Sequence, residues 1–253
     1  MSLIDIFNSH KDYYTDKWEQ YIYVYDMELK HIIEKGAPLS LLEVGIANGG
    51  SLQLWERFLP QGSKIYGIDI NPYCENIKYE PPIELYIGDA GKEEDLNKFF
   101  GNQQFDIIID DGSHICPDTI NNFYRLFPRL KNGGIYIVED VIASYGKYWK
   151  GGFRKKNTTV EFFKGLADAI NFDHVMKNPP RFFNKNLKNE LEELNKCLAS
   201  VAFYDSMIVL KKYNKPKEKP FRQIGAGLVF PVAEFPIPDE ARIPLKEDEN
   251  LFT

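Results

Sequence analysis

The chain is poor in cysteine and has no long apolar run, and each shortage excludes a class of protein. Its 253 residues include only three cysteines, an odd number that excludes a disulfide-stapled scaffold. No stretch approaches the roughly 18 apolar residues that a membrane-spanning helix needs. The first ten residues lack a basic start followed by an apolar stretch, so no signal peptide is expected. We therefore expect a reduced, cytoplasmic compartment.

Positive charge is also in short supply. The formal net charge is -6 at pH 7, which argues against nucleic acid as the main partner, because a polyanion needs a basic surface. Composition excludes a disordered chain, since 43% of the residues are hydrophobic and 14% are aromatic. What is present fits one globular domain with appendages.

Short apolar runs alternate with helical patterns through the middle of the chain. The runs expected to form buried strands are 39–45, 64–70, 83–89, 105–112 and 133–140. Strands that are apolar throughout and separated by helices predict an α/β fold with a parallel sheet covered on both faces. Further along, the pattern predicts a helix over 159–176 and an antiparallel hairpin over 200–212, with a tight turn at Asp205 and Ser206.

This pattern divides the chain into three segments. Residues 1–35 predict an N-terminal helical segment, because apolar positions from Trp18 to Ile33 follow helical spacing. Residues 36–213 predict the α/β core, and 214–253 predict a proline-rich tail or linker. The aromatic N-terminus and the tail are candidate interface material for a homo-oligomer.

A turn rich in small residues follows the first strand, in the sequence EVGIANGGS at 43–51. Small residues let the backbone approach a ligand, and the helix start offers free N–H groups, although a plain turn also uses glycine. Asp69 ends the second strand, where an acid can hold ribose hydroxyls, and Asp89 ends the third. Each acid alone is better explained as a helix N-cap. Together they favour an adenosine-like ligand at the carboxyl edge of the sheet.

Acidic side chains also end the fourth and fifth strands. Asp110 and Asp111 precede Gly-Ser-His114, and Glu139 and Asp140 close the fifth strand. Neighbouring parallel strands lie about 4.8 Å apart, so three of these carboxylates would converge and need a cation. Oxygen ligands suit Mg²⁺, and a histidine beside them suits a general base. The alternative is a set of helix-capping acids and a hydrogen-bonded turn histidine.

A basic loop follows the fifth strand. No acid occurs between Val141 and Val160, whereas lysines and an arginine are frequent there. We expect a mobile lid near 144–158 that grips an anionic part of a substrate, such as the diphosphate of a nucleotide-activated sugar. A solvated basic loop is the alternative. The candidate substrate contacts are Tyr145, Lys147, Arg154 and Lys155.

Several of these segments resemble the macrocin and mycinamicin sugar O-methyltransferases, which are class I enzymes that use S-adenosylmethionine and Mg²⁺. The similar stretches are LLEVGIANGGSLQLW, YGIDINPYC, FDIIIDDGSH, LFPRLKNGGIYIVED and the TDKW stretch at 15–18. The resemblance covers about residues 12–212. It implies a Rossmann-like, seven-stranded and mostly parallel sheet of order 3-2-1-4-5-7-6, with helices on both faces. Tyr21 and Ala90 depart from the family pattern, which has histidine and glutamine there.

The resemblance also implies roles for individual residues. Asp111, Glu139 and Asp140 would be the metal ligands, and His114, with Asp111 beside it, would carry the catalysis. The residues implied to hold the methyl donor are Glu43, Gly45, Asn48, Gly49, Ser51, Asp69, Asp89, Asp110, Thr15 and Lys17.

The function that follows is methyl transfer from S-adenosylmethionine to a sugar hydroxyl. The acceptor is a small molecule, either a nucleotide-activated sugar for cell-surface polysaccharide or a glycoside. Three rivals stay open. One is a catechol-like diol O-methyltransferase, and another is a non-catalytic subunit that binds the donor. The third is an iron-dependent hydroxylase of the cephalosporin-hydroxylase-like type, which would need two histidines and one carboxylate.

Overall fold

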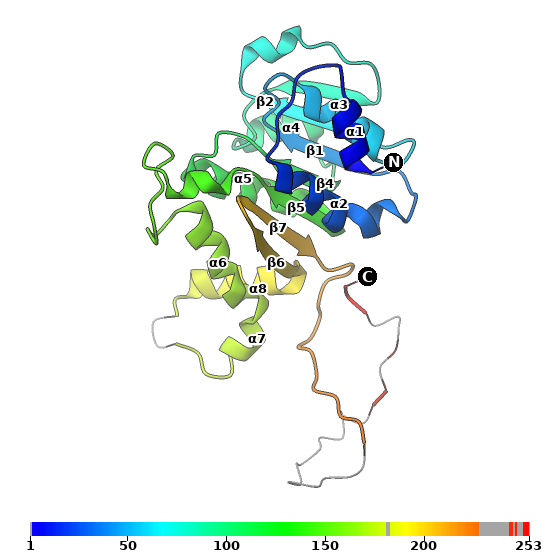
Figure 1. The fold of residues 1–253 in the computed structure, drawn as a ribbon. Coiled ribbons are helices and arrows are strands. Elements are labelled where there is room, and N and C mark those ends of the chain that lie inside the picture. Colours follow the sequence, from blue (N-terminus) through cyan, green and yellow to red (C-terminus); the bar gives the residue numbers. More distant parts are fainter. Residues whose placement is uncertain (1, 181–182, 228–242, 245, 247–249, 253) are drawn as a thin grey trace.

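The chain forms one seven-stranded sheet with helices on both faces (Figure 1). The structure is a computed structural model, and it describes residues 2–180, 183–227, 243–244, 246 and 250–252. The strands are β1 (Ser40–Val44), β2 (Lys64–Asp69), β3 (Ile83–Ile87), β4 (Phe105–Asp110), β5 (Leu130–Val138), β6 (Leu198–Tyr204) and β7 (Met207–Lys212). The α-helices are α1 (Leu3–Ser9), α2 (Glu19–Ile33), α3 (Gly50–Phe58), α4 (Glu93–Phe100), α5 (Cys116–Leu126), α6 (Thr159–Ile170), α7 (Phe172–Val175) and α8 (Lys185–Cys197). The short 3₁₀ helices are η1 (Pro72–Asn76), η2 (Phe127–Arg129) and η3 (Val141–Tyr145).

The strand order is β3-β2-β1-β4-β5-β7-β6, which confirms the order expected from the resemblance. Strands β1 to β5 pair in parallel, and β7 runs antiparallel to both β5 and β6. The predicted hairpin is confirmed, with Tyr204 paired to Met207 across the turn. The chain crosses from one side of β1 to the other before β4, and ligands in such sheets bind at this switch point, beyond the carboxyl ends of the strands.

Alternate residues of each strand face two separate apolar layers. Ile107 and Ile109 pack in the layer that holds α1, α2 and α3, whereas Ile108 packs in the layer of α4, α5 and α6. Because both faces are covered, the strands read as continuous apolar runs rather than as alternating patterns. The sheet therefore places its carboxyl ends rigidly, with α2 packed close to the ends of β4 and β5.

Several predicted boundaries differ from the structure: β3 ends at Ile87 and β4 at Asp110, each two residues before its predicted end, and two further differences follow. The helix expected over 159–176 is interrupted at Asn171, between α6 and α7. Strand β5 ends at Val138, so Glu139 and Asp140 lie in the turn that follows it. Asp140 has a left-handed φ of 51°, which an extended strand cannot contain. This turn carries both acids away from the strand direction.

The described part of the tail is tied to the core. The buried Lys217 pairs with Asp173 of α7 (2.7 Å), and within the tail the N–H of Asn214 donates to the carbonyl oxygen of Leu251 (2.9 Å). Half of the tail predicted over 214–253 lies outside the described residues. All three cysteines are unpaired. Among the described residues, no helix combines the length and the apolar character needed to cross a membrane.

Candidate active site

A cleft of about 1110 Å³ opens at the carboxyl ends of β1 to β5. The loops after these strands line it, together with residues 14–18 of the N-terminal segment. Predicted site residues that line it are Thr15, Lys17, Gly45, Asn48, Ser51, Asp69, Asp89, Asp111, His114, Glu139 and Asp140. The topology therefore brings most of the predicted residues into one cavity.

The loop after β1 is held against the loop after β4. Gly45 has a left-handed φ of 88°, and a Cβ at this position would overlap the backbone carbonyl of Asp111. A side chain would therefore separate the two loops that form the floor of the cleft. Gly49 also has a left-handed φ, of 87°, but its carbonyl accepts from Tyr79 and it is not among the cleft-lining residues.

Asp69, the last residue of β2, and Asp89, two residues after β3, accept hydrogen bonds from backbone N–H groups. Asp69 Oδ2 accepts from the N–H of Ile46 (2.7 Å) and of Ala47 (3.3 Å), and its Oδ1 accepts from the N–H of Asn71 (2.8 Å). Asp89 Oδ1 accepts from the N–H of Gly91 (2.9 Å). Both carboxylates are thus fixed at the wall of the cleft, where they face any ligand bound along the sheet edge.

Glu43 is fully buried at the end of β1 and does not line the cleft. Its Oε2 accepts from Ser51 Oγ (2.9 Å) and Trp55 Nε1 (3.1 Å), whereas its Oε1 has no hydrogen-bond partner. Burial raises the pKa of Glu43 to about 7. Its carboxylate faces inward to α3 and Lys17, and the contact of Glu43 with the methyl donor stays a prediction.

Asp111, His114 and Asp140 form an open polar cluster. One ligand atom from each side chain lies within 4.8 Å of the other two. His114 Nε2 is 3.9 Å from Asp111 Oδ1 and 3.6 Å from Asp140 Oδ2. These side chains are partly exposed to the cleft, and two carboxylates with an imidazole are a donor set that fits a divalent cation.

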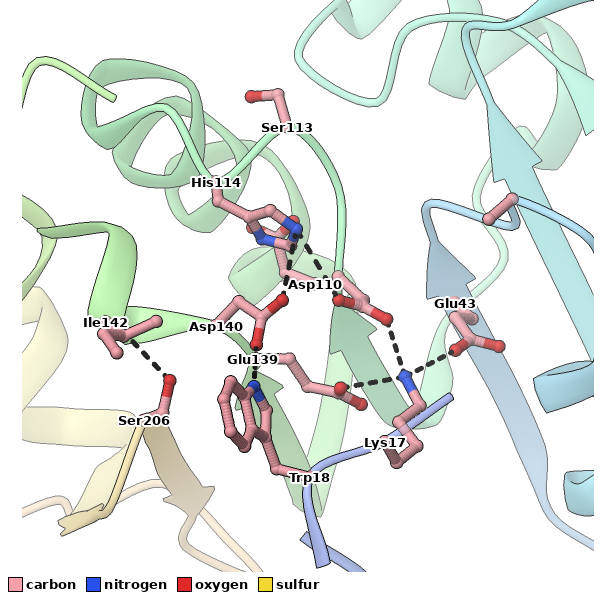
Figure 2. A network of polar contacts seen from close by, with 12 residues as sticks. Lys17, Trp18, Glu43, Asp110, Ser113, His114, Glu139, Asp140, Ile142 and Ser206 are labelled. Carbon is pink, nitrogen blue, oxygen red and sulfur yellow. Dashed lines mark hydrogen bonds and ion pairs between the residues drawn. The ribbon is translucent and has the colours of Figure 1, made fainter. Parts of the chain in front are cut away.

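Glu139 faces away from this cluster, toward Lys17 and Tyr25. Lys17 Nζ donates to Glu139 Oε2 (2.8 Å) and to Asp111 Oδ2 (2.6 Å), and Tyr25 donates a hydrogen bond to Glu139 Oε1. Figure 2 shows the Lys17 ammonium between Glu139 and Glu43. Lys17 is the cation of a buried acidic cluster, and it also lines the cleft, so its contact with the methyl donor stays a prediction. Whether Glu139 also holds a metal stays a prediction.

Electrostatics favour the charged state of Lys17. Burial alone would lower its pKa, but the charges of Glu139, Asp111 and Glu43 outweigh burial and raise the pKa well above its usual value. Burial raises the pKa of Glu139 as well, and Asp111 adds to that increase. Three carboxylates therefore compete for one ammonium group.

Two aromatic residues of the N-terminal segment hold Asp140. The Tyr21 hydroxyl lies 2.9 Å from Asp140 Oδ1 and accepts from the backbone N–H of Asp140 (2.9 Å). Trp18 Nε1 donates to the same carboxylate oxygen (3.2 Å; Figure 2). Sequence reasoning assigned the N-terminal tyrosines to core or interface and missed these contacts. Their helical spacing indicated burial but could not indicate the partner.

With this geometry in hand, the chain can be compared with known proteins. Residues 42–141 match the family described as "Methyltransferase domain". A solved methyltransferase from the mycinamycin biosynthetic pathway, in complex with Mg and SAH, superposes with a TM-score of 0.70 at 26% identity. That superposition covers 84% of this chain and 54% of the other. The chain has the fold of class I methyltransferases, and its residues 42–141 match a methyltransferase domain.

Curated relatives of this methyltransferase domain methylate sugars, according to their names. The 8-demethyl-8-alpha-L-rhamnosyl tetracenomycin-C 2'-O-methyltransferase of Streptomyces olivaceus is 33% identical over 66% of this chain and 45% of the relative. The mycinamicin VI 2''-O-methyltransferase of Micromonospora griseorubida is 31% identical over 60% of this chain and 41% of the relative. The resemblance to this group of enzymes is confirmed. The chain spans less than half the length of these relatives.

Asp110 has a supporting place in the methyltransferase domain. It is buried and does not line the cleft, and it accepts from Asn122 Nδ2 (3.1 Å) and the Tyr136 hydroxyl (3.3 Å). Burial raises its pKa to about 7. Asp110 is the last residue of β4 and faces the α5 layer, and its contact with the methyl donor stays a prediction.

The basic loop does not line the cleft of the methyltransferase domain in this structure. Tyr145, Lys147, Arg154 and Lys155 are all absent from the cleft wall. Lys155 Nζ donates to the carbonyl oxygen of Lys150 (2.8 Å) within the same loop. Contact of this loop with a substrate therefore stays a prediction.

Proposed function

We propose that this chain is an S-adenosylmethionine- and Mg²⁺-dependent O-methyltransferase that acts on a sugar hydroxyl. One observation carries the proposal: the open cluster of Asp111, His114 and Asp140 lies in the same cleft as the loops after β1, β2 and β3. A methyl donor and an oxygen acceptor could therefore meet in one cavity. The names of the relatives, which specify O-methylation of sugars, support the reaction type.

The donor fits the half of the cleft formed by the loops after β1, β2 and β3. Asp69 and Asp89 offer carboxylates to ribose hydroxyls and amines, and Gly45 allows close approach to the backbone. S-adenosylhomocysteine is the ligand named for the similar mycinamycin-pathway enzyme.

The metal fits the opposite half. Asp111 and Asp140 would hold Mg²⁺, with Glu139 as the predicted third ligand, because hard cations prefer carboxylate oxygens. When bound, such an ion lowers the pKa of the hydroxyl group on the sugar acceptor and fixes the direction of the hydroxyl oxygen. Trp18 and Tyr21 fix the orientation of Asp140 for this purpose.

His114 carries the proton transfer. Its Nε2 lies 3.9 Å from Asp111 Oδ1 and 3.6 Å from Asp140 Oδ2, and in this proposal it is left out of the metal's ligands, so its lone pair can accept the hydroxyl proton. The hydroxyl proton passes to His114 while the oxygen forms a bond to the methyl carbon. The carbon–sulfur bond breaks, and its electron pair leaves with sulfur, which releases S-adenosylhomocysteine. Positioning of the two reactants supplies much of the acceleration.

The acceptor is proposed as a sugar hydroxyl of a glycoside, the class in the relatives' names. A second candidate is a nucleotide-activated sugar used for cell-surface polysaccharide. One observation favours it: the basic loop with Lys147, Arg154 and Lys155 begins directly after Asp140 and η3. A diphosphate would pair with these cations.

The test combines binding and turnover. Calorimetric titration with S-adenosylhomocysteine, with Mg²⁺ and with chelator, measures donor binding; glycosides, nucleotide sugars and catechol are then screened for a gain of one methyl mass. His114→Asn should keep donor binding and lose turnover, whereas His174→Asn, at an exposed site on α7, should keep both. Absence of donor binding in every metal condition would contradict the proposal. Iron-dependent oxygen consumption would then favour the hydroxylase.

A further inference from the structure

The buried ammonium of Lys17 occupies the side of Asp111 that faces away from the open cluster. Asp111 Oδ2 accepts from Lys17 (2.6 Å), while Asp111 Oδ1 lies on the side of His114 Nε2 (3.9 Å). One carboxylate is thus shared between a resident cation and the place proposed for a metal. A divalent cation held by Asp111 would repel the ammonium at close range in a poorly hydrated environment.

A second position for this ammonium already exists. Glu43 Oε1 is fully buried, has no hydrogen-bond partner, and lies 3.9 Å from Lys17 Nζ. Leaving a buried carboxylate oxygen unpaired is costly, and a small movement of the ammonium would satisfy it. Its Oε2 is occupied by Ser51 and Trp55, so the carboxylate is held in place to receive a donor.

The Lys17 side chain can supply such a movement without a change in the backbone that carries it. Residues 10–18 link α1 to α2 without helix or strand of their own. Neighbours fix both ends, since the Tyr14 carbonyl accepts from Gly50 N–H (3.2 Å) and Trp18 bonds Asp140. Only the long Lys17 side chain needs to change rotamer, while the backbone stays anchored.

We propose that Lys17 is a built-in competitor of the metal: without a divalent cation it neutralises Asp111 and Glu139, and when one binds it transfers to Glu43 Oε1. The inference rests on the proposed function, in that it takes Asp111 as a metal ligand. It assigns to Lys17 and Glu43 a role in setting metal affinity, rather than contact with the methyl donor.

The experiment is a calorimetric titration of the purified chain with Mg²⁺ and with Mn²⁺, without donor or acceptor. Lys17→Gln and Lys17→Met remove the ammonium, and each should bind the metal at least about tenfold more tightly than the parent. Lys30→Met is the matched control, because it removes a charge from an exposed site on α2 and should leave metal affinity unchanged. Thermal melts without metal establish that each variant is folded. If Lys17→Met does not fold, Lys17→Gln still tests the inference, because its side chain retains a hydrogen-bond donor.

Glu43→Gln completes a double-mutant cycle. It keeps an oxygen for Ser51 and Trp55 and removes the acceptor for the displaced ammonium. It should weaken metal binding in the parent by several fold and have no effect when Lys17 is already replaced. Equal or weaker metal binding in both Lys17 variants overturns the inference, as does a Glu43 effect that is independent of Lys17. Absence of metal binding in every variant overturns it too, while donor binding is judged separately by the S-adenosylhomocysteine titration.

Discussion

The hydroxyl of Tyr25 offers a sharp test of how the acidic cluster is stabilised. Tyr25 is fully buried on α2 and donates to Glu139, whose other oxygen bonds Lys17. Tyr25→Phe keeps the ring, which packs on Trp55 at a centroid distance of 4.8 Å, and deletes only the donor. The substitution leaves one buried carboxylate oxygen without a partner, so the loss is a hydrogen bond to a charged group plus the cost of an unsatisfied acceptor.

The expected loss is about 2–3 kcal/mol in the free energy of unfolding. With a urea slope of about 2–3 kcal/mol per molar, the unfolding midpoint should fall by about 1 M. Tyr23→Phe is the matched control, since Tyr23 lies on the same helix with 62% of its surface exposed. That variant should change stability by less than about 0.5 kcal/mol.

Urea titration followed by tryptophan fluorescence measures both variants under the same conditions. Equal midpoints for the Tyr25 and Tyr23 variants would refute the reasoning. Such a result would mean that Glu139 is protonated or reaches another donor in solution, and that α2 does not stabilise the acids through this bond.

Two further predictions follow from the loop contacts and the buried acids. Gly45→Ala should abolish S-adenosylhomocysteine binding in calorimetry, because its Cβ would overlap the Asp111 carbonyl. Gly101→Ala, which is also at positive φ but has free space around it, should retain binding. Loss of binding in both variants, or in neither, contradicts the steric argument. Burial raises the pKa of Glu43 from 4.5 to about 7, so its contribution to stability is full below about pH 4.5 and is lost as the pH rises through about 7. Urea unfolding at several pH values should show that Glu43→Gln becomes more stable relative to the parent as the pH rises from 4.5 to about 7. Parallel curves of unfolding free energy against pH would contradict this prediction.

The sheet could be predicted because both faces of its strands are buried, so that their sequences are almost continuously apolar. Residues 105–110 are apolar except for Asp106 and Asp110, and such a run between helical patterns is typical of a covered parallel strand. The hairpin turn at Asp205 and Ser206 followed from turn chemistry in the same way. The break at Asn171 was not predicted from apolar periodicity; in the structure Asn195 Nδ2 of α8 donates to the carbonyl oxygens of Ala169 (2.9 Å) and Ile170 (3.2 Å), directly before the break.

The candidate site was predictable only in part, for a related reason. Positions at strand ends follow from topology, so the grouping of Asp111 with Asp140 could be expected. The partners of those acids come from α2 and the segment before it, and helical periodicity shows only which face is buried. Lys17, Tyr21 and Tyr25 therefore acquired their roles from tertiary packing, which a single sequence does not encode locally.

The sequence distances across this site have a consequence for synthesis of the protein. Lys17 bonds Asp111 across 94 residues, and Tyr21 bonds the carbonyl oxygen of Ser206 across 185. The carbonyl of Ser206 also accepts from Val141, directly beside the acids. The N-terminal aromatic segment leaves the ribosome before the acids do, but Tyr21 finds its last partner only when the β6–β7 hairpin has emerged. The wall of the cleft is therefore completed late, and a nascent chain stopped before residue 206 lacks the carbonyl that Tyr21 and Val141 bond.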